Sequence, residues 1–189
     1  MPAYTTFQFS FLKEDLYPKL VEDFYQAIQV EEVSFDKVFA WGCSENTSLE
    51  EIIEWNQEKI DSNFRLGYTE DVSNGFRQIL LKWAKTYECR IFISNDSNNF
   101  SFHLIIPEGD IYDSDNHSTL RKMLLSVVEK MPVYTVQSYD EISDSATVKQ
   151  LKNGVLPTIE YFGYVPSFIH KRLSNKLSNQ VKNGYFVEW

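Results

Sequence analysis

The stretch YECRIFISNDSNNFSFHLII, residues 87–106, decides the class of the fold because it predicts a β-hairpin. Residues 87–94 and 100–106 are rich in aromatic and β-branched side chains, which favour strands. The polar segment NDSNN, residues 95–99, lies between them and has the length of a hairpin loop. A hairpin joins antiparallel neighbours, so we expect an antiparallel sheet in the middle of the chain.

Strand patterns also occur outside this hairpin. Residues 4–12 contain Phe7, Phe9 and Phe11, which fall on one face of an extended chain and predict a half-buried strand. The other segments that favour strands are residues 36–43, 133–137 (as a short edge strand) and 185–189. Residues 76–83 fit a strand or a helix, and we favour the strand.

The clearest helix pattern begins at Ser48. Ser48 followed by Glu51 is a capping box, in which each side chain accepts a hydrogen bond from the backbone N–H of the other residue. Beyond it, apolar residues cluster on one face of the expected helix and acidic residues on another. Four further segments with helical periodicity are residues 15–28, 119–131, 142–153 and 166–183.

These elements predict an α+β fold with helices packed on a mainly antiparallel sheet and with a helix-rich C-terminal half. A length of 189 residues and a hydrophobic content of 43% suit one domain, residues 1–189, that buries a core without disulfides. The first ten residues lack the basic start and apolar run of a secretory signal, and the apolar runs elsewhere are short. We therefore expect a cytoplasmic protein with no membrane span.

The net charge of −9 is concentrated near the N-terminus. Residues 1–63 hold 13 acids and four bases, whereas residues 64–189 hold 14 of each. Nucleic-acid binding requires a basic surface that releases counterions from phosphates, so a nucleic-acid partner is disfavoured. A basic protein partner is better matched, because complementary potentials speed association.

Four acidic residues of the helix that begins after Ser48 are the candidate partner-binding residues. Glu50, Glu54, Glu58 and Asp61 follow one another at spacings of four, four and three, which places them on one side of a helix. The functional interpretation of this side is a docking surface for a basic partner. The alternative interpretation is an ordinary solvated helix face.

Catalytic and metal-binding motifs are absent from the sequence. The seven glycines are solitary, which argues against a phosphate-binding loop, and the three histidines are isolated. A calcium loop starting at Asp113 fails, because Ser118 and Leu124 stand where Gly and Glu are needed. We instead expect the acids around Asp113 to complement the positive end of the helix that follows. No metal, cofactor or enzymatic activity is predicted.

Two other classes of function remain open as alternatives. A hydrolase-like enzyme could assemble dispersed residues such as Cys43 with His103 or His170, although a partly buried histidine in a strand is the simpler interpretation of His103. A small-molecule-binding domain could use the aromatic cluster from Tyr161 to Phe168, although core packing is the simpler interpretation of that cluster.

In its general character the chain resembles the bacterial immunity proteins of toxin–immunity systems, which are small, acidic, single-domain α+β proteins of the cytosol. The resemblance covers size, charge and the absence of catalytic motifs. It implies a non-enzymatic protein that binds and neutralises a basic protein partner, such as a toxin. It carries over no residue roles, and it leaves the oligomeric state open.

Overall fold

The computed structural model describes residues 3–31, 33–41, 47–65, 78–83, 87–95, 99–173 and 177–188. The strands are β1 (Tyr4–Leu12), β2 (Val33–Trp41), β3 (Gln78–Trp83), β4 (Tyr87–Asn95), β5 (Asn99–Pro107), β6 (Thr135–Asp140), β7 (Phe162–Pro166), β8 (Leu177–Val181) and β9 (Gly184–Glu188). The helices are α1 (Leu20–Ile28), α2 (Leu49–Arg65), α3 (Glu108–Ile111), α4 (Ser114–Lys130), α5 (Val148–Lys152) and α6 (Ser167–His170), and Lys13–Asp15 form a 3-10 turn.

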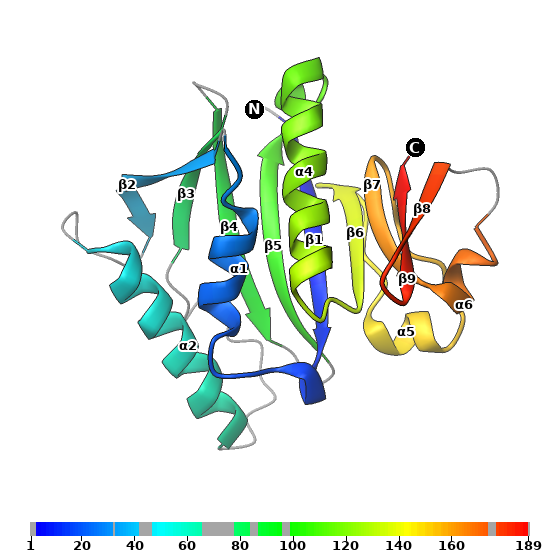
Figure 1. Cartoon of the computed structure of the whole chain (residues 1–189), viewed down its shortest axis with the longest axis horizontal. Coiled ribbons are helices and arrows are strands. Elements are labelled where there is room, and N and C mark those ends of the chain that lie inside the picture. The colour runs from blue at the N-terminus through cyan, green and yellow to red at the C-terminus, as the bar shows by residue number, and fades with distance from the viewer. Residues whose placement is uncertain are drawn as a thin grey trace.

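The nine strands form one sheet in the order β2-β3-β4-β5-β1-β6-β7-β9-β8, and neighbouring strands are antiparallel (Figure 1). The predicted class, α+β with a mainly antiparallel sheet, is therefore confirmed. No helix in the described part of the chain has both the length and the apolar character that crossing a membrane requires.

β1 lies near the middle of the sheet and carries its core residues on one face. It pairs along its whole length with β5 and on its other side with β6. Phe7, Phe9 and Phe11 are fully buried, as the alternation in the sequence predicts. Helices α1 and α4 cover this face, which we call the front of the sheet (Figure 1).

The predicted hairpin is present as β4 and β5, which pair from Arg90 opposite Ile105 to Asn95 opposite Phe100. The tip of its loop, residues 96–98, lies outside the described residues. The predicted capping box is also present, because Ser48 N donates to Glu51 Oε2 at 2.7 Å and Glu51 N donates to Ser48 Oγ at 3.1 Å. Both features come from local chemistry that does not depend on the rest of the fold.

Helices α5 and α6 cover the other face of the sheet at its C-terminal end. Leu151 of α5 and Ile169 of α6 pack with Val165 of β7 and Val187 of β9, and all four side chains are fully buried. On the front, Arg121 of α4 donates from Nε to Glu188 Oε1 of β9 at 2.6 Å. Helices on both faces thus hold the last strands.

Three predicted elements differ from the structure. The segment 133–137 was expected at an edge, but β6 lies inside the sheet between β1 and β7. The helix expected over residues 142–153 is confined to α5, and the helix expected over residues 166–183 ends at His170 and is followed by β8. A spacing of four puts side chains on one face of a strand as well as of a helix, so this pattern could not separate the two.

The C-terminal half is consequently a mixture of helices and strands. It holds α3 to α6 but also β5 to β9, and α4 is its one helix of more than five residues in the described part of the chain. Helix α1 also begins later than its expected start at residue 15. Pro18 lies in a turn before α1, consistent with the weak tendency of the residue preceding a proline to be helical.

Replacing Gly184 by Ala should destabilise the protein by about 1–3 kcal/mol, because overpacking against fixed atoms is unfavourable. A Cβ at Gly184 would lie 2.5 Å from the carbonyl oxygen of Val165, and no side-chain rotation can relieve a clash with the backbone. Gly109→Ala is the matched control, since a Cβ there meets nothing within 4 Å. Urea unfolding measures both variants, and equal stabilities would contradict the prediction.

Candidate functional site

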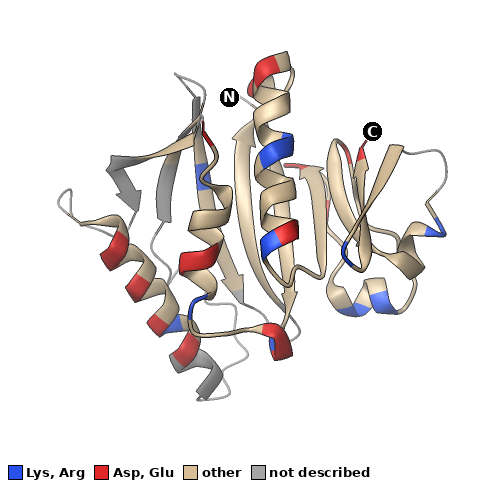
Figure 2. Ribbon diagram, in the orientation of Figure 1, with Lys and Arg blue, Asp and Glu red and all other residues tan. Residues whose placement is uncertain are grey.

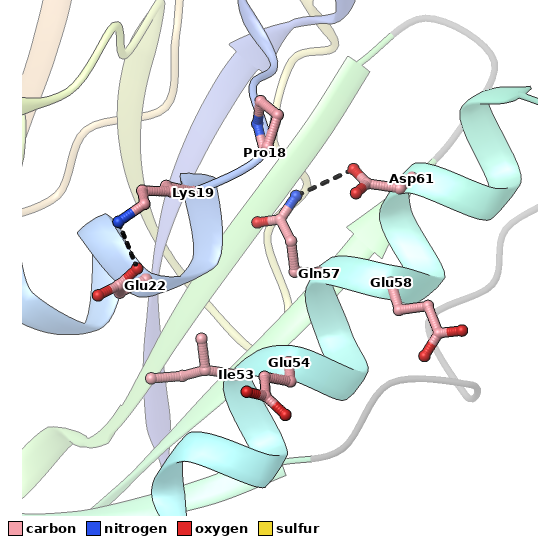
Figure 3. Close-up of a pocket in the computed structure, with 8 residues that line it drawn as sticks. All are labelled: Pro18, Lys19, Glu22, Ile53, Glu54, Gln57, Glu58 and Asp61. Atoms are coloured by element: carbon pink, nitrogen blue, oxygen red, sulfur yellow. Dashed lines mark hydrogen bonds and ion pairs between the residues drawn. The ribbon is translucent and has the colours of Figure 1, made fainter.

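A groove of about 500 Å³ runs between the start of α1 and the middle of α2 (Figure 3). The predicted residues Glu54, Glu58 and Asp61 line it, so the structure brings together three of the four acids singled out in the sequence. Glu50 is exposed in the first turn of α2 and does not line the groove. The remaining lining residues are Pro18, Lys19, Glu22, Ile53 and Gln57.

Gln57 connects the two helices that form the groove. Its Oε1 accepts a hydrogen bond of 3.0 Å from the backbone N–H of Val21, in the first turn of α1. Its Nε2 lies 3.3 Å from the carbonyl oxygen of Tyr17 and 3.1 Å from Asp61 Oδ1. Lys19, the N-cap residue of α1, makes no side-chain capping bond, so Gln57 supplies from α2 the acceptor that α1 lacks.

The lining of the groove is strongly acidic. Glu22 of α1 faces the acids of α2, and four carboxylates stand against one ammonium group, that of Lys19. Lys19 lies 3.5 Å from Glu22, but the two side chains are 73% and 40% exposed, so this surface pair is weak. Figure 3 shows the apolar side chain of Ile53 between Glu22 and Glu54. The groove therefore offers an apolar floor beside uncompensated negative charge.

Two features of this surface escaped the sequence analysis. Glu22 belongs to α1, and its position opposite α2 depends on tertiary packing that no local pattern reveals. Trp55 is 42% exposed on α2 and follows Glu51 by four residues and precedes Glu58 by three, which places it among the acids. A large aromatic residue between acidic positions of a helix was the signal that could have identified Trp55.

A second cluster of polar groups lies on the back of the sheet, where β4, β5, β1 and β6 adjoin. His103 Nε2 is 2.7 Å from Ser94 Oγ, and His103 Nδ1 is 3.5 Å from the hydroxyl of Tyr139. Tyr139 in turn donates to Gln8 Oε1 at 3.3 Å, and Gln8 Nε2 donates to Ser101 Oγ at 3.1 Å. His103 is thus a partly buried, hydrogen-bonded histidine in a strand, as predicted.

The contact between Ser94 and His103 has the residue types of a nucleophile–base pair. In a catalytic triad a buried carboxylate commonly orients the histidine and stabilises its charged form. Among the described contacts, His103 is followed by the phenol of Tyr139 and then by the amide of Gln8. Burial raises the pKa of Tyr139, which favours the neutral phenol. The hydrogen bonds cross four neighbouring strands, so the arrangement is suited to holding β1 in register.

The other chemically reactive candidates are distributed as follows. Cys43 lies outside the described residues. Cys89 is fully buried, and burial raises the pKa of its thiol well above the usual range, with the Asp110 carboxylate adding to the effect. His170 is held by Ser178 Oγ at 2.9 Å and stacks on Tyr185 with ring centroids 3.7 Å apart. Asp113 is the N-cap of α4 and accepts from the N–H groups of Asp115 and Asn116, so it lies at the positive end of that helix, where the acids were expected.

Aromatic residues 161–168 are divided between core and surface. Phe162 and Tyr164 are buried on the front of the sheet, which confirms core packing for that part of the cluster. Phe168, on α6, is 47% exposed. None of these residues lines the groove between α1 and α2. Within the described residues, no three histidine, cysteine or acidic side chains lie close enough together to hold a metal ion.

Comparisons with known proteins support the fold alone. No family model matches this chain, and no curated protein matches it. Among solved structures, the chain is similar to the Pseudomonas aeruginosa T6SS (type VI secretion system) protein PA0821, with a TM-score of 0.51 and 8% sequence identity. The match covers 98% of this chain and 65% of that protein, so this chain spans about two thirds of its length.

Gln57→Ala should lower the free energy of unfolding by about 1–2 kcal/mol, as for other lost helix caps. The change leaves the N–H of the buried residue Val21 without its acceptor. Gln26→Ala is the control, because Gln26 is exposed and bonds only to Glu22 within α1; we expect a change of less than about 0.5 kcal/mol. Chemical denaturation with both variants checks this, and equal losses would contradict the capping role.

Asp110→Asn should stabilise the protein increasingly as pH rises. Asp110 is 8% exposed, its Oδ2 has no hydrogen-bond partner within the described residues, and burial raises the pKa of its carboxyl group. An acid whose pKa is raised on folding contributes its full stabilisation at pH values below its unfolded-state pKa. That stabilisation is lost as pH rises through its folded-state pKa. The difference in unfolding free energy between variant and native protein should therefore grow as pH rises above the unfolded-state pKa of an aspartate, about 3.9. A difference independent of pH would contradict it.

Proposed function

We propose that this chain is a non-enzymatic protein of the cytoplasm that binds and neutralises a basic protein partner, as immunity proteins of toxin–immunity systems do. The observation that carries the proposal is the acidic groove between α1 and α2. A fold shared with a T6SS protein is consistent with a role in a toxin system.

The charge of the two helices supports a basic partner. Together α1 and α2 hold seven acidic and two basic residues, and Figure 2 shows the acids along the outer side of α2. A field of one sign raises the rate at which an oppositely charged protein arrives, by roughly 10–1,000-fold at low salt. Fast association suits a protein whose task is to capture a harmful partner before it acts.

The shape of the groove suits long basic side chains. The methylene groups of a lysine or arginine can pack on Ile53 and Pro18 while the charged end reaches the carboxylates of Glu22 and Glu54. Trp55 adds an aromatic residue of the kind that dominates the energetics of protein interfaces. The partner's basic surface would then be covered by α2, and covering that surface is a sufficient means of neutralisation.

The test is a capture experiment from the native lysate at low salt, with mass spectrometry as the readout. We expect one basic protein to be retained and to be released at high salt, because screening shortens the range of the attraction. Reversing Glu54 and Glu58 to Lys should reduce its retention and lower its association rate by about tenfold or more. The control is Glu129→Lys with Glu141→Lys, which makes the same change in net charge at exposed sites on other elements.

Retention of the same protein by the Glu54/Glu58 variant and by the control would show that α2 is not the interface. Failure to retain any basic protein at low salt would count against the proposed function itself. Thermal unfolding of both variants confirms that the comparison is made between folded proteins.

A further inference from the structure

The described structure has a second charged surface at the opposite end of the sheet from α2. Helices α5 and α6 pack behind the strands β7 and β9, whereas α2 lies towards β2 and β3 (Figure 1). Four exposed cations gather on these two short helices and at the end of α6, and we call them the basic surface (Figure 2). They are Lys149, Lys152, Lys171 and Arg172.

Packing brings these cations together. The guanidinium of Arg172, just after α6, lies 2.9 Å from the point that a Cβ on Gly154 would occupy, directly after α5. Lys149 and Lys152 are three residues apart on α5 and therefore lie on one side of it. Lys152 also lies 5.7 Å from the centre of the ring of Tyr134, the residue that precedes β6.

Basic residues outnumber acidic ones in the segment that carries the basic surface. Between residues 145 and 187 the chain has one acid, Glu160, and the carboxylate of Glu188 is taken by Arg121 of α4. None of the four cations makes an ion pair with a described residue. Exposed apolar side chains accompany them: Val155 and Leu156 after α5 and Phe168 on α6 are 45–47% exposed.

We propose that the occupant of the basic surface is the acidic face of α2 of a second copy of this chain. The two surfaces match in charge, with four cations on one and the four carboxylates of Glu50, Glu54, Glu58 and Asp61 on the other. Each surface also has an exposed aromatic residue on the same helices, Trp55 on α2 and Phe168 on α6, which can supply apolar contact. This proposal does not depend on the identity of any other partner.

The position of the two surfaces determines the geometry of the assembly. The acidic face lies on α2, which packs with the front core, whereas the basic surface lies on α5 and α6 behind the last strands, so one neighbouring copy does not cover both surfaces of another. An isologous two-fold dimer is therefore disfavoured and the contact is heterologous, joining unlike surfaces. Because the surfaces lie at opposite ends of the sheet, an assembly of any length still presents one free acidic surface at one end and one free basic surface at the other. The copies therefore add head to tail, and the mean size grows with concentration.

The same acidic face serves both the self-association and the partner proposed above. A basic partner that binds α2 competes with the basic surface of the next copy, so it should shorten the chains. Self-association would thus keep the acidic face covered until a tighter basic ligand displaces it.

Sedimentation velocity of the purified protein tests the inference, over a range of concentrations at low and at high salt. The native protein should gain mass with concentration at low salt and return to the monomer at high salt. Two variants each neutralise two of the four charges of one surface without reversing charge: Glu54→Gln with Glu58→Gln, and Lys149→Gln with Lys152→Gln. Each variant alone should remain monomeric. An equimolar mixture should form dimers and nothing larger, because just one pair of intact surfaces remains.

Three results would overturn the inference. They are a native protein that stays monomeric at low salt, association that survives the loss of either surface, and a mixture of the variants that forms no dimer. Anionic vesicles and a DNA duplex serve as further probes of the basic surface. If the native protein binds either probe and does not self-associate, the basic surface has a polyanionic ligand instead of a second copy.

Discussion

The packing of Phe24 against the sheet is the contact on which the position of α1 depends. The ring of Phe24 stacks on Phe102 of β5 with centroids 3.8 Å apart and meets the edge of Phe9 of β1 at 5.3 Å. Aromatic pairs of this kind contribute about 0.5–1.5 kcal/mol beyond the burial of their area. Since β1 and β5 lie in the middle of the sheet, α1 is anchored to the most central part of the fold. The position of the groove depends on the same contact, because α1 forms one of its walls.

The distribution of charge follows from this anchoring. The front of the sheet is covered by apolar faces of α1 and α4, so the acids of α1 and α2 are confined to the outer side, where water solvates them. The cations of α5 and α6 are placed by a separate small core behind the last strands. The two helix pairs are therefore positioned by two separate cores, and opposite charges lie at opposite ends of one sheet. The net charge of −9 does not reveal this separation.

The parts of the fold that were predicted correctly are those with local chemical signals. Alternating Phe7, Phe9 and Phe11 predicted β1, two strand-forming runs predicted the hairpin of β4 and β5, and Ser48 with Glu51 predicted the start of α2. Prediction failed where the same spacing of apolar residues suits both a helix and a strand. Ile169 and Leu177 would lie on one side of the chain in either structure, so the spacing did not show where the helix ends. The position of β6 inside the sheet could not be predicted, because it depends on pairing with β1, which is more than 120 residues away.

The same distinction applies to the candidate site. The acids of α2 could be identified because they recur on one helix, and three of them line the groove. The opposing wall of the groove, with Glu22 and Lys19, arises from the docking of α1 and has no signature of its own in the sequence. Gln57 is an extreme case, since a glutamine in a helix gives no sign that it caps another helix 36 residues earlier.

Because Gln57 of α2 caps the first turn of α1, the opening motions of the two helices are coupled. When α2 separates from the sheet, the N–H of Val21 loses its acceptor, so the first turn of α1 should open in the same event. A molecule bound across the groove holds both helices at once and raises the free energy of that shared opening. The amide hydrogens of α1 would then exchange more slowly with solvent even where the bound molecule touches only α2.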